Sequence, residues 1–194
     1  MGAIRLTTQD ALRRPESDAL KELLLEILAC VDQATDVVCN NGVDSLADEG
    51  EVDLVDLVTS RRRVLRRIAG RRVDLAMRFS SVPPIYGSPT SIAQAITNLV
   101  KNAAEAMGNQ EGRITVSTRM HGDHVLLEVE DDGPGFDADV RARACEAFFT
   151  TKQAGRGLGL ALVRQIALVH GAQLEIDSEP GRGSVVRLRF LPAT

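Results

Sequence analysis

The sequence predicts an α+β fold preceded by an N-terminal helix, and three observations lead to this prediction. Apolar residues recur at helical spacing over a long stretch that ends before Gly50. From Glu51 onward, segments with apolar residues at every second position are interspersed with segments of helical period. The 194 residues, of which 44% are hydrophobic and 26% charged, provide enough apolar material for one globular domain with an appended element.

The N-terminal segment is predicted to be a helix with one apolar stripe. Pro15, which is followed by acidic residues, is typical of a helix start. The stripe consists of Leu20, Leu24, Ile27, Leu28, Val31, Ala34 and Val38. The helix ends at residues 40–42 or continues to about Asp48. We therefore predict a helical segment over residues 1–50 and a second domain over residues 51–194.

The first half of the second domain is predicted to mix short strands and helices. A strand over 52–54 and a helix over 57–68, closed by Gly70, are followed by a strand over 73–79. Two prolines at 83 and 84 break that strand. Ser88 or Thr90 caps the next helix, which ends near Gly108.

The second half is predicted to contain a hairpin, a loop, a helix and two closing strands. Strands over 114–120 and 125–129 flank a turn around Gly122, and strand parity places Asp131 on the face of the buried valines. The stretch 133–157 is a loop with a short helix after Asp139, and a helix follows over 158–169. Strands over 174–176 and 185–190 flank a turn at 180–183.

Composition argues against several classes of protein. Aromatic residues make up 3% of the chain, too few for a base-stacking surface, and the net charge of -4 does not suit a nucleic-acid binder. A long uncharged apolar run and a secretory signal are both absent, so we expect a soluble cytoplasmic chain without a membrane segment. Three cysteines without CxxC spacing predict reduced thiols, mostly buried, rather than disulfides or zinc ligands.

Seven arginines lie between Arg61 and Arg72. One basic helix does not make the large patch that is typical of nucleic-acid binding, so we favour a solvated helix face. A docking surface for a partner domain is the alternative.

The helix that reads NLVKNAAEAM carries the first candidate site. Asn98, Asn102 and Glu105 are spaced i, i+4 and i+7, so they share a face at the edge of the apolar stripe. A solvated polar face and an amide oxygen directed at a hard cation such as Mg²⁺ are both consistent with this spacing.

Asp131 carries the second candidate site, because its strand directs a carboxylate toward the core just before DGPGF. A buried charge needs a partner. That partner is either a structural group, such as the backbone N–H groups of the glycine turn, or the amino group of a ligand. Gly133 and Gly135 allow close backbone approach, which a turn alone also explains.

The segment FFTTKQAGRGLGLALV is the third candidate site. Gly155, Gly157 and Gly159 precede an amphipathic helix, where free N–H groups favour an anion. Thr150, Thr151 and Lys152 lie just upstream, where they suit a lid over phosphate oxygens. The segment matches neither the Walker loop nor the dinucleotide fingerprint, and a plain surface loop is the alternative.

Taken in order, these motifs resemble the ATP-binding domain of bacterial sensor histidine kinases, within the group that includes gyrase, the heat-shock chaperone ATPase and the mismatch-repair ATPase. The matching motifs are NLVKNAAEAM, DDGPGF, AFFTTK, GRGLGL and EPGRGSVVRLRF, which lie between Ile92 and Phe190. The resemblance implies the Bergerat fold, a two-layer α/β sandwich in which helices cover one face of a mixed sheet.

The resemblance also implies a set of roles. Asn102 is the ligand of Mg²⁺ on the phosphates of ATP, Asp131 accepts from the adenine amino group, and Lys152 belongs to the lid. The implied nucleotide-binding set is Asn98, Asn102, Glu105, Asp131, Gly133, Gly135, Phe136, Thr150, Thr151, Lys152, Gly155, Arg156, Gly157, Leu158, Gly159 and Leu160.

Two positions refine the resemblance. Asn98 stands where the hydrolysing relatives carry a glutamate that activates water, and an amide is no general base, so a kinase is favoured over an ATPase, with Asn98 and Asn102 as its catalytic pair. Glu105 departs from the basic residue of many members, although nitrogen-sensor-like members often have Gln or Glu there.

The chain has no histidine before His121, where the first helix of a dimerisation hairpin would carry the phosphoacceptor. We interpret residues 1–50 as the second helix of such a hairpin, which leaves a homodimer through it open. His121 and His124 are expected on the surface, and His170 at a helix end where the dipole favours its protonated form.

The sequence thus predicts a catalytic ATP-binding domain that transfers the γ-phosphate to a histidine outside this sequence, for relay to a response regulator. As an isolated chain it is expected not to phosphorylate itself. The alternative is a free-standing, nucleotide-dependent regulatory module or a serine kinase like the anti-sigma factors.

Overall fold

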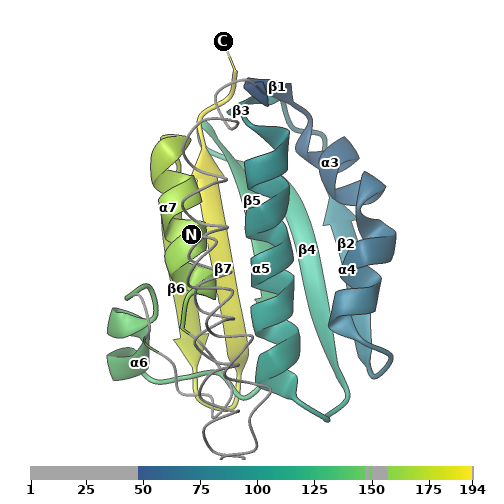
Figure 1. Ribbon diagram of the computed structural model, residues 1–194, viewed down its shortest axis with the longest axis vertical. Coiled ribbons are helices and arrows are strands. Elements are labelled where there is room, and N and C mark those ends of the chain that lie inside the picture. The colour runs from purple at the N-terminus through teal and green to yellow at the C-terminus, as the bar shows by residue number, and fades with distance from the viewer. Residues whose placement is uncertain (1–47, 147–148, 150–156, 194) are drawn as a thin grey trace, which may run out of the picture. The chain divides into compact units, whose positions relative to one another are not determined.

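A mixed sheet of five strands, in the order β2-β4-β5-β7-β6, forms the centre of the computed structural model (Figure 1). Strands β2 and β4 pair in parallel and the other neighbours are antiparallel. The structure describes residues 48–146, 149 and 157–193, all within the unit Ser45–Thr194. The strand bounds are β2 Val73–Phe79, β4 Gly112–His121, β5 His124–Asp131, β6 Gln173–Glu179 and β7 Gly183–Phe190.

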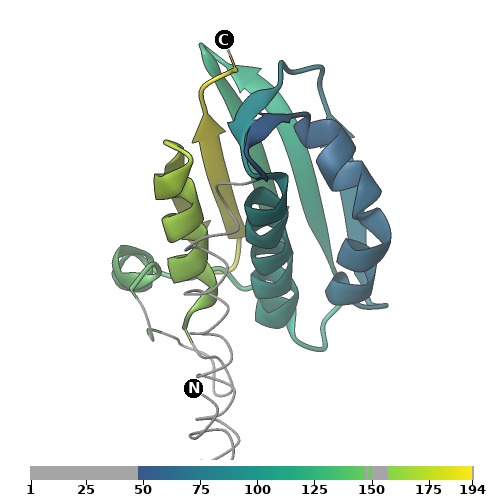
Figure 2. The same cartoon turned by 45° about the horizontal axis from the view of Figure 1, so that its top comes forward.

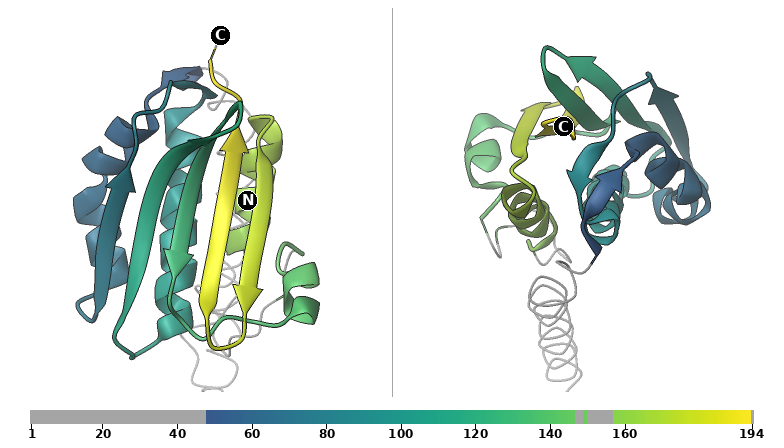
Figure 3. Two further views of the ribbon diagram at one scale, coloured as in Figure 1. Left: turned by 180° about the vertical axis from the view of Figure 1, so that it is seen from behind. Right: turned by 90° about the horizontal axis from the view of Figure 1, so that it is seen from above.

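The described helices lie on one face of this sheet, and none of them covers the other face, which we call the bare face (Figure 3, left). Helix α5 packs between α4 and α7. The helix bounds are α3 Leu54–Ser60, α4 Arg62–Ala69, α5 Pro89–Met107, α6 Ala138–Arg143 and α7 Gly159–Val169. This arrangement confirms the predicted α+β sandwich with helices on one face of a mixed sheet.

The core lies between the sheet and the helices. Val125, Leu127 and Val129 of β5 are at most 3% exposed, and Leu99 of α5 and Ile166 of α7 are each 2% exposed. Asp131 follows them on the same face of β5, as strand parity predicts, and is itself buried.

Two local elements differ from the sequence-based prediction. The single helix expected over 57–68 is two helices, because Arg61 leaves the helical conformation with φ -94° and ψ 1°. The strand expected over 52–54 is instead β1 Gly50–Val52, because the Asp53 carboxylate caps α3 by accepting from the N–H groups of Val55 and Asp56.

A strand absent from the prediction, β3 Ile85–Gly87, follows the two prolines and pairs antiparallel with β1. Figure 2 brings forward this pair beside the N-terminal end of α5. The predicted N-terminal helix lies outside the described residues, apart from its last few positions, so it and the boundary near Gly50 stay predictions. No helix in the described part of the chain is long and apolar enough to cross a membrane.

Candidate functional site

The predicted site residues on α5 lie along one side of that helix. Asn98 and Asn102 are half-buried, whereas Glu105 is exposed and lies 3.8 Å from Lys101 Nζ through its Oε1. The Asn98 Nδ2 donates to the carbonyl of Gln94 at 3.0 Å, so that half of its amide is used within the helix. The edge position that the i, i+4 spacing predicts for the two asparagines is confirmed.

Gly159, the first residue of α7, packs against the side chain of Asn102. A Cβ placed on Gly159 would lie 2.8 Å from Asn102 Oδ1 and 3.0 Å from its Nδ2. A side chain at position 159 would therefore have to displace the Asn102 amide from its present position. The two candidate motifs meet at this contact between Asn102 and Gly159.

Asp131 ends β5 with its carboxylate 6% exposed and both oxygens hydrogen-bonded. The Gly133 N–H donates to Oδ1 at 3.0 Å, and the Ser184 hydroxyl donates to Oδ2 at 2.5 Å. Burial raises the pKa of Asp131 above its ordinary value, and the hydrogen bonds from Ser184 and Gly133 offset only part of that effect. The structural partner expected in the glycine turn is present, and each oxygen retains a second lone pair.

The loop after Asp131 approaches neighbouring backbone so closely that only glycine fits. Gly135 has φ +61°, and a Cβ there would lie 2.0 Å from the carbonyl oxygen of Glu179. A Cβ on Gly183, at φ +82°, would lie 1.9 Å from the carbonyl oxygen of Asp131. The turn alone accounts for these glycines, so their part in a base pocket stays a prediction.

Further contacts join this loop to the helices and the sheet. A Cβ on Gly133 would lie 3.5 Å from Cγ of Met107, the last residue of α5. The Phe136 N–H donates to Ser178 Oγ on β6 at 2.9 Å. These contacts connect the loop 132–136, which follows β5, to the C-terminal part of α5 and to β6.

The glycine-rich segment is described only from Gly157 onward. Gly157 has φ +65°, Leu158 is 8% exposed, and Gly159 and Leu160 form the first turn of α7. The remaining predicted lid residues lie outside the described residues: Thr150, Thr151, Lys152, Gly155 and Arg156. Their roles stay predictions.

The described residues include no group of three or more His, Cys, Asp or Glu side chains that could hold a metal ion. An ion that arrives on nucleotide phosphates needs few protein ligands, and the Asn102 amide is a donor of the right type for Mg²⁺. The residues present therefore fit a phosphate-borne Mg²⁺ rather than a resident metal centre.

Ser184 is a site residue that the sequence analysis missed. It lies on β7 directly opposite Asp131 in the antiparallel register. Its position after the last glycine of EPGRGS was visible in the sequence, but only the strand register shows which carboxylate it meets. Ser178, which also donates to the carbonyl of Gly183 at 3.0 Å, was missed for the same reason.

Comparisons with known proteins agree with the order of the motifs. Residues 87–194 match the family of histidine kinase-, DNA gyrase B- and HSP90-like ATPases. The chain is 34% identical over 188 residues to the sensory histidine kinase/phosphatase NtrB of Azospirillum brasilense, over 86% of this chain and 47% of that protein. It is 35% identical over 144 residues to the sensor histidine kinase ZraS of Escherichia coli, over 73% of this chain and 30% of that protein.

The fold agrees as well. The solved structure of a mycobacterial sensor histidine kinase, MprB, superposes with a TM-score of 0.63 and 25% identity, over 74% of this chain and 97% of that chain. The chain spans less than half the length of the two curated relatives above. It belongs to the family of histidine kinase-, DNA gyrase B- and HSP90-like ATPases, and its domain is the ATP-binding catalytic domain of a sensor histidine kinase.

Proposed function

We propose that this chain binds Mg-ATP and transfers the γ-phosphate to a histidine outside this sequence, for relay to a response regulator in the cytoplasm. The observation that carries the proposal is the buried Asp131 carboxylate, whose hydrogen-bond donors among the described residues, Ser184 and Gly133, are neutral. A buried carboxylate with spare acceptor capacity suits the exocyclic amino group of adenine.

The base site is built around β5 and the loop that follows it. Asp131 accepts from the adenine amino group while Ser184 and Gly133 hold the carboxylate in place. Gly133, Gly135 and Phe136 line the base pocket. Since two neutral hydrogen bonds fix the orientation of the carboxylate before the base arrives, little ordering is needed on binding.

The phosphate site lies farther along α5. Asn102 is the proposed protein ligand of Mg²⁺, which neutralises charge on the phosphates when bound. Asn98, one turn earlier, lies on the same side of the helix and supplies an amide rather than a base, which favours transfer over hydrolysis. Glu105, exposed next to Lys101, is proposed at the outer edge of this site.

The first turn of α7 is proposed to face the phosphates. The N-terminus of an 11-residue helix presents free N–H groups and a positive dipole end to an anion. Gly157, Leu158, Gly159 and Leu160 form this end. Thr150, Thr151, Lys152, Gly155 and Arg156 are proposed as the lid that covers the nucleotide.

The acceptor is proposed to lie elsewhere, because no histidine of the chain lies within a helix: His121 and His124 flank the β4–β5 turn, and His170 is the C-cap of α7. His121 is exposed on the β4–β5 hairpin, and His124 Nδ1 lies 2.5 Å from Asp123 Oδ1. His170 is held between two helices. A histidine from another segment of a longer protein or from a second copy, brought close by dimerisation through residues 1–50, is the proposed partner.

The experiment that tests the proposal is intact-mass analysis after incubation with Mg-ATP, repeated after mild acid, with nucleotide binding measured in parallel. We expect nucleotide to bind in a Mg²⁺-dependent way, no phosphoryl group to be gained, and Asn102→Ala to lose the Mg²⁺ dependence. Asn109→Ala, an exposed asparagine beyond the same helix, is the control.

Two outcomes would contradict this proposal. A parent chain that binds no Mg-nucleotide has no ATP site of the proposed kind. A gain of one acid-stable phosphoryl group would favour the serine-kinase alternative, because phosphohistidine is lost in acid and phosphoserine is not.

A further inference from the structure

His170 joins the C-terminal end of α7 to the N-terminal end of α5. Its Nδ1 lies 2.7 Å from the carbonyl oxygen of Ile166, one turn earlier in α7. The Ser88 N–H donates to its Nε2 at 3.0 Å. Ser88 is also the N-cap of α5, where its Oγ accepts from the N–H of Ser91.

These two partners fix the protonation state of the imidazole. A carbonyl oxygen only accepts, so Nδ1 carries a proton, and a backbone N–H only donates, so Nε2 carries a lone pair. Both bonds exist only in the neutral Nδ1–H form of His170. The expectation that the helix dipole favours protonated His170 does not suit this contact, because a second proton on Nε2 would face the Ser88 N–H.

The chain makes space for the ring at Gly87. A Cβ on Gly87 would lie 2.3 Å from His170 Cδ2 and 2.9 Å from its Nε2. Gly87 is not among the glycines with positive φ, so its backbone conformation does not require glycine. The position of the imidazole therefore explains why residue 87 is glycine. We call this contact of His170 with Gly87 and Ser88 the joint.

The joint and the proposed phosphate site lie at opposite ends of the antiparallel pair formed by α5 and α7. Helix α5 runs from Ser88 to Asn102 and beyond, about 20 Å away at the rise of an α-helix. Helix α7 runs back from Gly159, which packs on Asn102, to His170, which binds Ser88. The pair is thus held at both ends, and a shift of α7 along α5 would alter both contacts.

We propose that neutral His170 is a positioning residue for the phosphate half of the nucleotide site. By tying α7 to the N-cap of α5, it sets where the first turn of α7 meets Asn102. This inference rests on the proposed role of Asn102 and the first turn of α7. The adenine half should not depend on the tie, because Asp131 is held by Ser184 and Gly133 on other elements.

The test compares Mg-AMPPNP, which uses both halves of the site, with adenosine, which uses only the base half. We expect His170→Ala to weaken Mg-AMPPNP binding about fivefold to tenfold, the equivalent of one hydrogen bond, and to leave adenosine binding unchanged. His170→Gln, which keeps an acceptor for the Ser88 N–H, should recover most of the loss. His121→Ala removes an exposed histidine and is the control.

The hydrogen bond between His170 and Ser88 can also be tested without any nucleotide. Nitrogen-15 NMR of the imidazole should show the Nδ1–H tautomer for His170, and the Nε2–H tautomer would overturn the proposal. Gly87→Ala, whose new methyl group displaces the ring, should reproduce the loss if His170→Ala does not fold.

The remaining outcomes separate this inference from the proposed function. A folded His170→Ala that binds Mg-AMPPNP as the parent does would overturn the positioning role while leaving the ATP site intact. An equal loss for Mg-AMPPNP and adenosine would also overturn it, because that result indicates a general structural role. If the parent chain binds adenosine and Mg-AMPPNP with the same affinity, that result would instead overturn the proposed phosphate site.

Discussion

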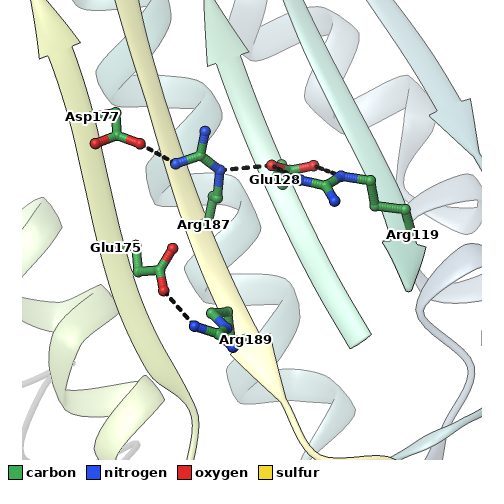
Figure 4. Close-up of polar contacts among 6 residues, drawn as sticks. All are labelled: Arg119, Glu128, Glu175, Asp177, Arg187 and Arg189. Atoms are coloured by element: carbon green, nitrogen blue, oxygen red, sulfur yellow. Dashed lines mark hydrogen bonds and ion pairs between the residues drawn. The ribbon is translucent and has the colours of Figure 1, made fainter. Parts of the chain in front are cut away.

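Two buried carboxylates on β5 face opposite sides of the sheet and are paired in opposite ways. Asp131 faces the helices and is 6% exposed, and Glu128, three residues earlier, faces the bare side and is 8% exposed. Glu128 accepts from Arg119 Nε at 2.7 Å and Nη2 at 3.1 Å, and from Arg187 Nε at 2.7 Å (Figure 4). Among the described residues, Asp131 accepts from the neutral groups of Ser184 and Gly133 and not from an arginine.

This difference in partners gives the two pKa values opposite directions. Burial raises the pKa of Glu128, but the hydrogen bonds from Arg119 and Arg187 outweigh it, so the net shift is downward. Burial dominates at Asp131, so its pKa is raised. A buried carboxylate that the fold leaves without a cation costs stability, and such groups mark functional sites more often than ion-paired groups do.

Further ion pairs lie near Glu128 on the bare face of the sheet. Arg187 also binds Asp177, and Arg189 Nη1 donates to Glu175 Oε1 at 2.8 Å, so that β6 and β7 are joined by two ion pairs (Figure 4). These pairs link residues on neighbouring strands, where opposite charges stabilise a sheet. The charges of the bare face therefore have a structural role, whereas the helix-covered face carries Asp131, the proposed acceptor for adenine.

The largest expected effect comes from Asp131→Asn. The amide keeps the shape of the side chain but loses the charged acceptor, so we expect adenine-nucleotide affinity to fall by about 10- to 100-fold. Because burial raises the pKa of the parent carboxyl, the variant should be as stable at neutral pH as the parent, or more stable. Isothermal titration calorimetry and thermal unfolding measure the two effects.

Glu130→Gln, the exposed neighbour on β5, is the matched control for Asp131→Asn and should change neither quantity. Undiminished nucleotide affinity in Asp131→Asn would remove Asp131 from the site and leave the contrast between the two faces without a functional meaning.

The second effect concerns Glu128→Gln. Arg119 and Arg187 both lose the charge of Glu128, and Arg187 keeps Asp177 as a partner. We expect a loss of about 2 kcal/mol in the free energy of unfolding, below the roughly 3–5 kcal/mol of a fully buried pair, because Arg119 is partly exposed. Nucleotide affinity should not change. Glu175→Gln, whose side chain is 41% exposed against 11% for Glu128, is the control and should cost much less in urea unfolding.

Local patterns were enough to predict most of the sheet and helix layer. Period-two alternation predicts β4 and β5, and it also predicts that Asp131 is buried, because parity needs only the residues of one strand. Helical spacing and a cap at Ser88 or Thr90 predict the helix observed as α5, and the structure shows that Ser88 is the cap.

What the sequence did not predict depends on contacts between distant segments. The bond between Ser184 and Asp131 requires the β5–β7 register, and the joint of His170 with Ser88 requires the packing of α7 on α5. Strand β3 is three residues long and exists through its pairing with β1, so no periodicity reveals it. Pairing across such distances is set by the whole fold and has no local signature.

The smallest expected effect is a pair of opposite pH dependences. A raised folded-state pKa at Asp131 contributes stability that is present below the unfolded pKa of about 4 and is lost as pH rises through the folded value. The stability advantage of Asp131→Asn over the parent should therefore grow as pH rises above about 4. A change of one unit in the pKa is worth about 1.4 kcal/mol.

The pH dependence of stability that we expect from Glu128 has the opposite sign. Its lowered pKa contributes stability that is present above the unfolded value of about 4.3 and is lost as pH falls through the folded value. The deficit of Glu128→Gln should therefore shrink as the pH falls below about 4, where the deficit of an ordinary packing defect would stay constant. Urea unfolding of the parent and the two variants across this range measures both slopes. Parallel curves for all three chains would mean that neither carboxylate has a pKa perturbed by its surroundings. Curves that diverge in opposite directions would show that the helix-covered face raises the pKa of Asp131 and that the bare face lowers the pKa of Glu128.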